Sequence, residues 1–74
     1  MRDRAEIVTG CFSDLMENGY SFKAATELSI TLQLVTETLF FKLGIDDPSD
    51  EHFSEVIACL SAVMQKGSEA LKED

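Results

Sequence analysis

The fold is decided by the stretch at residues 22–43, which reads FKAATELSITLQLVTETLFFKL. It contains neither glycine nor proline, so it predicts one long helix. Ser21 directly precedes it and is a good N-cap, because its hydroxyl can accept a hydrogen bond from an unpaired amide of the first turn. Gly44 directly follows it and ends the helix, since glycine readily adopts the left-handed conformation found after helix ends.

This helix carries two apolar stripes when its residues are placed about 100° apart. The first stripe comprises Leu28, Leu32, Val35, Leu39 and Leu43. The second, on nearly the opposite side, comprises Ile30, Leu34, Phe41 and Ile45, with Phe22 and Phe40 between the stripes. A helix that is apolar on both sides is normally buried on both sides.

We therefore expect an interface on this helix, with a second copy of the chain or with another protein. The residues expected to form it are Ile30, Leu34, Phe40, Phe41 and Ile45. Leaving four large apolar side chains in water forgoes roughly 1.5–3 kcal/mol each, which is comparable with the whole stability of a small domain. The alternative is that two flanking helices sandwich residues 22–43 within one chain.

The flanking segments also have helical periodicity. From residue 3 to 18 the apolar residues recur every three or four positions, and Asn18-Gly19 supplies a stop. A third helix is expected over residues 48–71, with Pro48 in its first position and Asp47 as its cap. The sequence thus predicts an all-α single domain over residues 1–74, a three-helix bundle or a helical hairpin plus a helix, completed by homodimerisation.

The length supports the expectation of a partner. A chain of 74 residues buries only about 60% of its unfolded surface, and its single core seldom yields more than roughly 3–5 kcal/mol. Cys11 and Cys59 allow at most one disulfide, so a second protein chain is the simplest supplement.

The charge narrows the choice of partner. Fourteen acidic residues oppose six basic ones and give a formal net charge of -8. Such a surface repels phosphate backbones and anionic lipids, so we expect no direct nucleic-acid binding and no membrane binding. An acidic patch is expected around the start of the third helix, at Asp46, Asp47, Asp50, Glu51 and Glu55. These acids complement the helix dipole, or they engage a basic partner by imitating nucleic-acid phosphates.

The chain is expected in the cytoplasm. Its first six residues, MRDRAE, carry charges of both signs, unlike the basic start and apolar middle of a signal peptide. The longest uncharged stretch, residues 56–65, is far shorter than the roughly 18 residues that span a bilayer. In a reducing compartment the two cysteines are expected to be thiols.

The sequence matches no catalytic or metal-binding motif in full. His52 is the only histidine, and the acids around it lack the central glycine and the twelfth-position glutamate of an EF-hand loop. Cys11 or Cys59 with His52 would resemble a nucleophile and its base, but both cysteines fall on or beside apolar stripes, where a thiol packs as a small hydrophobe. We expect no enzyme activity, no cofactor, no metal and no small-molecule substrate.

These features predict a non-catalytic protein that acts by protein–protein interaction. It would bind a larger protein or complex and regulate it, and this regulation includes possible inhibition of that protein. Compact acidic proteins of this kind are often encoded by phages and mobile elements. Two alternatives stay open: an accessory structural subunit of an enzyme or secretion assembly, and an acidic nucleic-acid mimic that blocks a nucleic-acid-binding protein.

Overall fold

The chain folds into three helices connected by short segments. The computed structural model describes residues 3–72, with side chains placed for residues 3–70. The helices are α1 (Arg4–Glu17), α2 (Phe22–Lys42) and α3 (Asp50–Lys72), and the described part of the chain contains no strand. The predicted all-α class is confirmed.

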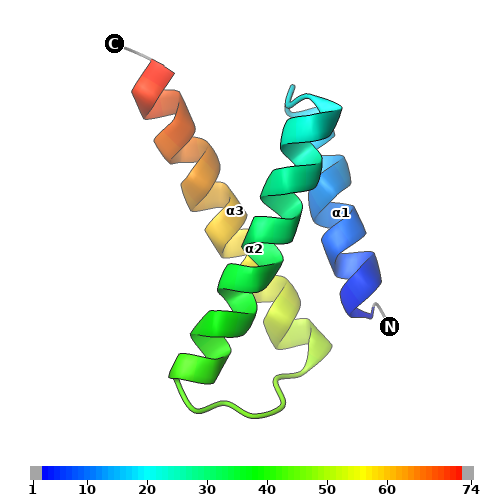
Figure 1. Ribbon diagram of the computed structural model, residues 1–74, viewed down its shortest axis with the longest axis vertical. Helices are drawn as coiled ribbons and strands as arrows, with labels where there is room; N and C mark the ends of the chain where they lie inside the picture. The colour runs from blue at the N-terminus through cyan, green and yellow to red at the C-terminus, as the bar shows by residue number, and fades with distance from the viewer. Residues whose placement is uncertain (1–2, 73–74) are drawn as a thin grey trace.

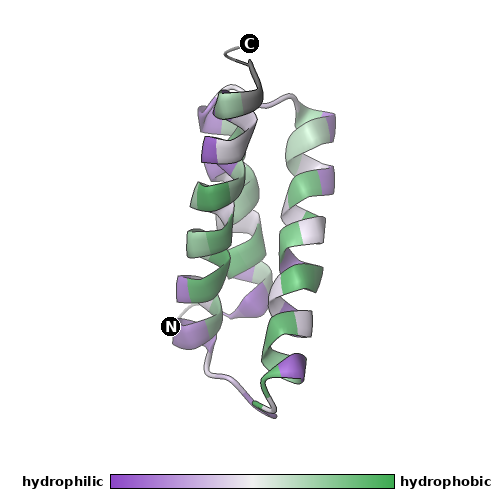
Figure 2. Ribbon diagram, turned by 90° about the vertical axis from the view of Figure 1, so that its left-hand side faces the viewer, coloured by the Kyte–Doolittle hydropathy of each residue, from purple (hydrophilic) through white to green (hydrophobic). Residues whose placement is uncertain are grey.

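The helices form two layers. Figure 2 shows α2 alone on one side of the molecule and α1 with α3 on the other. In Figure 1, α2 lies in front and crosses α3 obliquely. The principal extents of 40 × 23 × 16 Å describe a flat molecule. Because α1 and α3 contact the same side of α2, they do not sandwich it, and the alternative of a fully covered α2 within one chain is wrong.

Both ends of α1 are fixed by local hydrogen bonds, and the stop predicted at Asn18-Gly19 is confirmed. At the start of α1, the carboxylate of Asp3 accepts a hydrogen bond from the Glu6 amide at 2.9 Å. At the other end the Tyr20 amide donates to the Leu15 carbonyl at 3.1 Å, and Gly19 adopts a φ of 94°. This backward hydrogen bond around a left-handed glycine is the Schellman arrangement, which satisfies carbonyls that the helix leaves unpaired.

The two ends of α2 follow the same rules. The Ser21 hydroxyl accepts from the Ala24 amide at 3.1 Å, as predicted for an N-cap. Beyond Leu43, Gly44 has a φ of 75° and the Ile45 amide donates to the Phe40 carbonyl at 2.9 Å. Both ends of the long helix are therefore fixed by local hydrogen bonding.

The start of α3 differs from the expectation. The helix begins at Asp50, and the hydroxyl of Ser49 accepts from the His52 amide at 3.1 Å, while the Ser49 carbonyl accepts from the Phe53 amide at 2.9 Å. Ser49 is thus the cap, and the prediction that Asp47 caps a helix starting at Pro48 is wrong. Serine and aspartate are comparable N-caps, so sequence alone does not separate the two registers.

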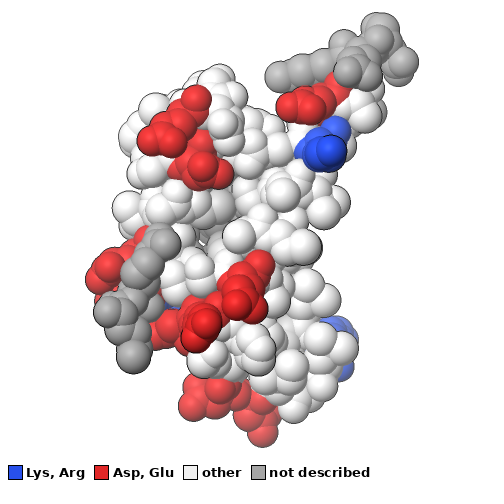
Figure 3. All heavy atoms as spheres, turned by 180° about the vertical axis from the view of Figure 1, so that it is seen from behind, with Lys and Arg blue, Asp and Glu red and all other residues white. Residues whose placement is uncertain are grey.

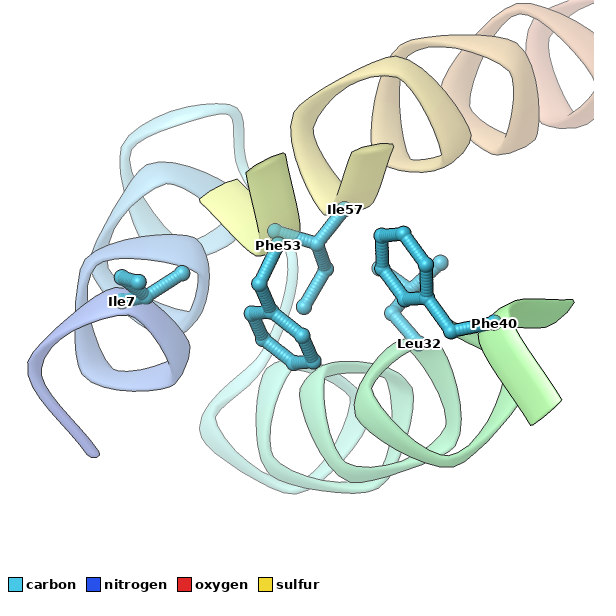
Figure 4. Close-up of a cluster of buried hydrophobic side chains, with 5 residues drawn as sticks. All are labelled: Ile7, Leu32, Phe40, Phe53 and Ile57. Atoms are coloured by element: carbon cyan, nitrogen blue, oxygen red, sulfur yellow. The ribbon is translucent and has the colours of Figure 1, made fainter. Parts of the chain in front are cut away.

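The core lies between the two layers. Figure 4 shows Phe53 and Ile57 of α3 between Ile7 of α1 on one side and Leu32 and Phe40 of α2 on the other. All five side chains are buried, and Phe53 is completely so. The core therefore joins all three helices through the first half of α3.

Candidate functional site

The side of α2 that faces away from the other layer is apolar. Ile30, Leu34 and Phe41 fall within about 40° of one another on the helix and are 49%, 59% and 78% exposed. Ile45, just beyond the helix end, is 42% exposed. We call these four residues the outer face of α2. Contiguous apolar patches of several hundred square ångströms on a small protein mark interaction surfaces.

The opposite side of α2, against α1 and α3, carries smaller and more polar residues. Its buried members are Ala25, Ser29, Leu32, Thr36 and Phe40. The Ser29 hydroxyl donates to the Thr26 carbonyl at 3.0 Å, and the Thr36 hydroxyl donates to the Leu32 carbonyl at 2.7 Å. These hydrogen bonds within the helix satisfy both buried hydroxyls, so two polar residues occupy the core side while large apolar ones face outward.

One predicted interface residue is misplaced. Phe40 is only 7% exposed and belongs to the core, so it is removed from the expected interface. The first apolar stripe is not the buried side of α2 either, because its members Val35, Leu39 and Leu43 are 43%, 38% and 69% exposed. Small side chains at Ala25, Ser29 and Thr36 give two helices room to pack against α2, and nothing in apolar periodicity reports that preference.

Charge is distributed unequally between the layers. Helix α2 carries two lysines and two glutamates and is therefore neutral. Figure 3, which views the molecule from behind α2, shows Asp and Glu side chains outnumbering Lys and Arg over the other layer. The net negative charge thus lies away from the outer face of α2.

No described helix has an apolar stretch long enough to cross a membrane.

The predicted acidic patch is divided between a loop and a helix start. Asp46 and Asp47 are exposed in the loop before α3, while Glu51 and Glu55 are exposed on its first turns. Asp50 differs, because its carboxylate pairs with the Arg4 guanidinium at 3.1 Å and both side chains are about one-third exposed. Four of the five acids therefore face solvent and one is held within the fold.

Arg4 links the start of α1 to the start of α3. Besides Asp50, its guanidinium donates to the Pro48 carbonyl at 2.7 Å and lies 4.3 Å from the centroid of the Phe53 ring. A planar guanidinium suits this combination, since its edge donates hydrogen bonds while its face stacks on an aromatic ring. This contact could not be expected from local sequence patterns, because the residues that Arg4 contacts are more than forty positions away.

The two thiols and the single histidine lie in different environments. Cys11 is half-buried, and its pKa is raised by desolvation, an effect that a hydrogen bond with Ser61 opposes and the charge of Asp14 reinforces. A raised pKa reduces the thiolate fraction, which is the nucleophilic form. Cys59 and His52 are exposed on α3. Within residues 3–70, no three His, Cys, Asp or Glu side chains are grouped so that they could hold a metal ion.

A polar hollow of about 480 Å³ lies between the α1–α2 turn and the second half of α3. Asn18 and Gln65 meet there, with the Asn18 side-chain amide donating to the Gln65 carbonyl oxygen at 2.9 Å. Ser68 and Glu69 complete one wall. Asn18 and Gln65 thus pair with each other, and Glu69 is the one charged residue among those that line the hollow.

Comparison of the chain with protein-family models, with curated proteins and with solved structures finds no match.

Proposed function

We propose that the chain is a non-catalytic protein-interaction module that docks the outer face of α2 on a protein and so binds or regulates a larger protein or complex. The observation that carries this proposal is the unusual distribution of side chains on α2. Ser29 and Thr36 are buried against the other helices, whereas the large apolar residues Ile30, Leu34 and Phe41 are exposed. Placing these apolar side chains in water is unfavourable unless another surface covers them.

The size of the patch fits a regulatory contact. Taking about 200 Å² for a fully exposed large side chain, the outer face presents roughly 450 Å² of apolar surface. At 25 cal/mol per Å² this area corresponds to an upper value of about 11 kcal/mol, and only the surplus over an association cost of about 4–15 kcal/mol appears as affinity. This balance supports reversible binding, with homodimerisation and docking on a different protein both within reach.

The acidic layer supports a second contact by the same module. Asp46, Asp47, Glu51 and Glu55 are exposed, and acidic side chains gather over the layer of α1 and α3 (Figure 3), so a basic surface can approach that layer while α2 is engaged. An inhibitor of a nucleic-acid-binding protein would use this layer as a phosphate mimic. Its binding would weaken steeply as salt is raised from about 0.05 to 0.5 M, whereas docking through α2 would not.

We propose that the module acts in the cytoplasm. Cys11 and Cys59 are not bonded to each other in the structure, an arrangement compatible with a reducing compartment. Fractionation of the cells that make the protein tests this location.

Affinity purification with matched variants tests the docking proposal. The tagged chain, the variant Leu34→Gln/Phe41→Gln and the control Val63→Gln are expressed in the cells that naturally make the protein. Val63 is 65% exposed on α3 and matches the changed residues in chemistry and exposure. We expect the wild type and the control to retain the same stoichiometric protein, and the double variant to lose it while keeping its helical circular dichroism. Equal retention by all three chains would refute docking through α2.

A further inference from the structure

We infer that the occupant of the outer face of α2 is the α2 of a second copy, packed antiparallel about a two-fold axis that passes between residues 37 and 38. This inference rests on the proposed function and names the partner at the same surface. Three independent observations carry it: the surface area of the chain, the charge of α2 and the spacing of the four outer-face residues.

The first observation is excess surface. A compact monomer of 8.2 kDa is expected to expose about 4,500 Å². This chain exposes 5353 Å², about 800 Å² more than that expectation. One partner in a standard interface contributes about 800 Å², of which somewhat more than half is apolar. The roughly 450 Å² apolar surface of the outer face is the share that such an interface needs.

The second observation is charge. A second copy also carries a net charge of -8, so two copies repel each other unless they meet through a neutral surface. Helix α2 is the least charged surface available, because Lys23 and Lys42 balance Glu27 and Glu37 over the helix as a whole, while Asp46 and Asp47 lie only beyond its end. A basic partner would instead be drawn to the acidic layer on the far side. The neutral face therefore favours a second copy over a protein of opposite charge.

The third observation is a self-complementary spacing. A two-fold interface requires that residue i of one chain contacts residue j of the other and that j contacts i. Leu34 and Phe41 stand at equal sequence distances from the midpoint between residues 37 and 38, and so do Ile30 and Ile45. An antiparallel pair centred there places Leu34 against the partner's Phe41 and Ile30 near the end of the partner's α2, beyond which Ile45 lies after the turn at Gly44.

This geometry makes a specific prediction about two glutamates. Glu37 lies beside the two-fold axis, so it approaches the partner's Glu37 to within a few ångströms along the helix direction. Glu27 lies far from the axis, and its distance along the helix from the partner's Glu27 is about 30 Å at 1.5 Å per residue. In a parallel dimer, by contrast, both glutamates would lie equally close to their copies.

Sedimentation equilibrium of the full-length protein from about 1 µM to 1 mM, a range that covers ordinary dimer affinities, is the test. We expect a monomer–dimer equilibrium that Leu34→Gln/Phe41→Gln weakens at least tenfold and that Val63→Gln leaves unchanged. We expect Glu37→Gln to tighten the dimer about two- to fivefold at low salt, because it removes one repulsive pair, and Glu27→Gln to change it less than 1.5-fold. Circular dichroism verifies that each variant stays folded.

Three results would overturn the inference. A chain that stays monomeric throughout the range excludes the second copy as occupant. A dimer that Leu34→Gln/Phe41→Gln does not weaken lies on another surface. Equal effects of Glu27→Gln and Glu37→Gln indicate a parallel pair. If the chain stays monomeric, the affinity purification decides whether the proposed function survives. The proposed function stands if the double variant Leu34→Gln/Phe41→Gln loses a protein that the wild type and Val63→Gln retain. It fails if the double variant retains that protein as well.

Discussion

Adjacent phenylalanines in α2 provide a direct test of which side of the helix is the core. Phe40 is 7% exposed and Phe41 is 78% exposed. Truncating a buried phenylalanine to alanine costs about 3–5 kcal/mol, which matches the whole stability expected of a domain this small. Alanine at position 41 removes only about 45 Å² of covered surface, or about 1 kcal/mol.

Leucine substitutions keep both variants folded and therefore measurable. We expect Phe40→Leu to lower the free energy of unfolding by about 1–1.5 kcal/mol, and Phe41→Leu to change it by less than about 0.5 kcal/mol. Urea denaturation followed by circular dichroism at a protein concentration near 1 µM measures the chain with little association. An equal loss for both variants at this concentration would refute the assignment of sides.

The same pair of variants reports on association. Binding of a second copy to the native state stabilises it in proportion to the logarithm of concentration. We expect the loss caused by Phe41→Leu to grow as the concentration rises to about 500 µM, while the loss caused by Phe40→Leu stays nearly constant. A Phe41→Leu effect that does not change with concentration would contradict any role of this side chain in self-association.

Three further predictions follow from local features. Gly44→Ala should destabilise the fold by about 1–2 kcal/mol in urea denaturation, because Gly44 has a φ of 75°. Gly67→Ala should instead stabilise it by about 0.5–1 kcal/mol, because Gly67 lies in α3 with open space around the added methyl group. Changes of the same sign in both variants would contradict the assigned backbone conformations. Arg4→Met should lower the free energy of unfolding by about 1 kcal/mol, since the lost ion pair with Asp50 is partly screened by water and methionine retains some contact with the ring of Phe53. No change in the thermal midpoint would show that the contacts of Arg4 contribute nothing to stability. Burial raises the pKa of Cys11 above its unfolded value near 9.0, so the contribution of the protonated thiol to stability is present below pH 9 and is lost as the pH rises towards the folded pKa. Cys11→Ala should therefore flatten the decline of the free energy of unfolding above pH 9. An unchanged slope in this variant would contradict the raised pKa.

The helix ends could be predicted from sequence because they depend on neighbouring residues. Ser21, Gly19 and Gly44 each act through hydrogen bonds that span at most five positions, so their roles are visible in the local sequence. The start of α3 was harder, because Asp47 and Ser49 are both acceptable caps. The structure selects Ser49, and Arg4 holds the Pro48 carbonyl beside it.

The orientation of α2 could be predicted only in part. Apolar periodicity identified two stripes and correctly placed Ile30, Leu34 and Phe41 apart from Leu32. Phe40, which lies between the stripes, was expected in the interface and is instead buried in the core. Periodicity ranks positions by hydrophobicity, whereas packing against two helices also selects small side chains. The hydroxyls of Ser29 and Thr36 bond within their own helix, so burying them costs little. This solution depends on how close the helices approach, which the order of residues does not specify.

The separation of a neutral helix from an acidic layer gives the molecule an electric dipole across its thinnest dimension of 16 Å. A particle with such a dipole turns as it nears a positively charged surface and arrives with its acidic layer first. The outer face of α2 then points away from that surface and stays accessible to another molecule. One copy bound there would thus present the outer face of its α2, on which a second copy can pack.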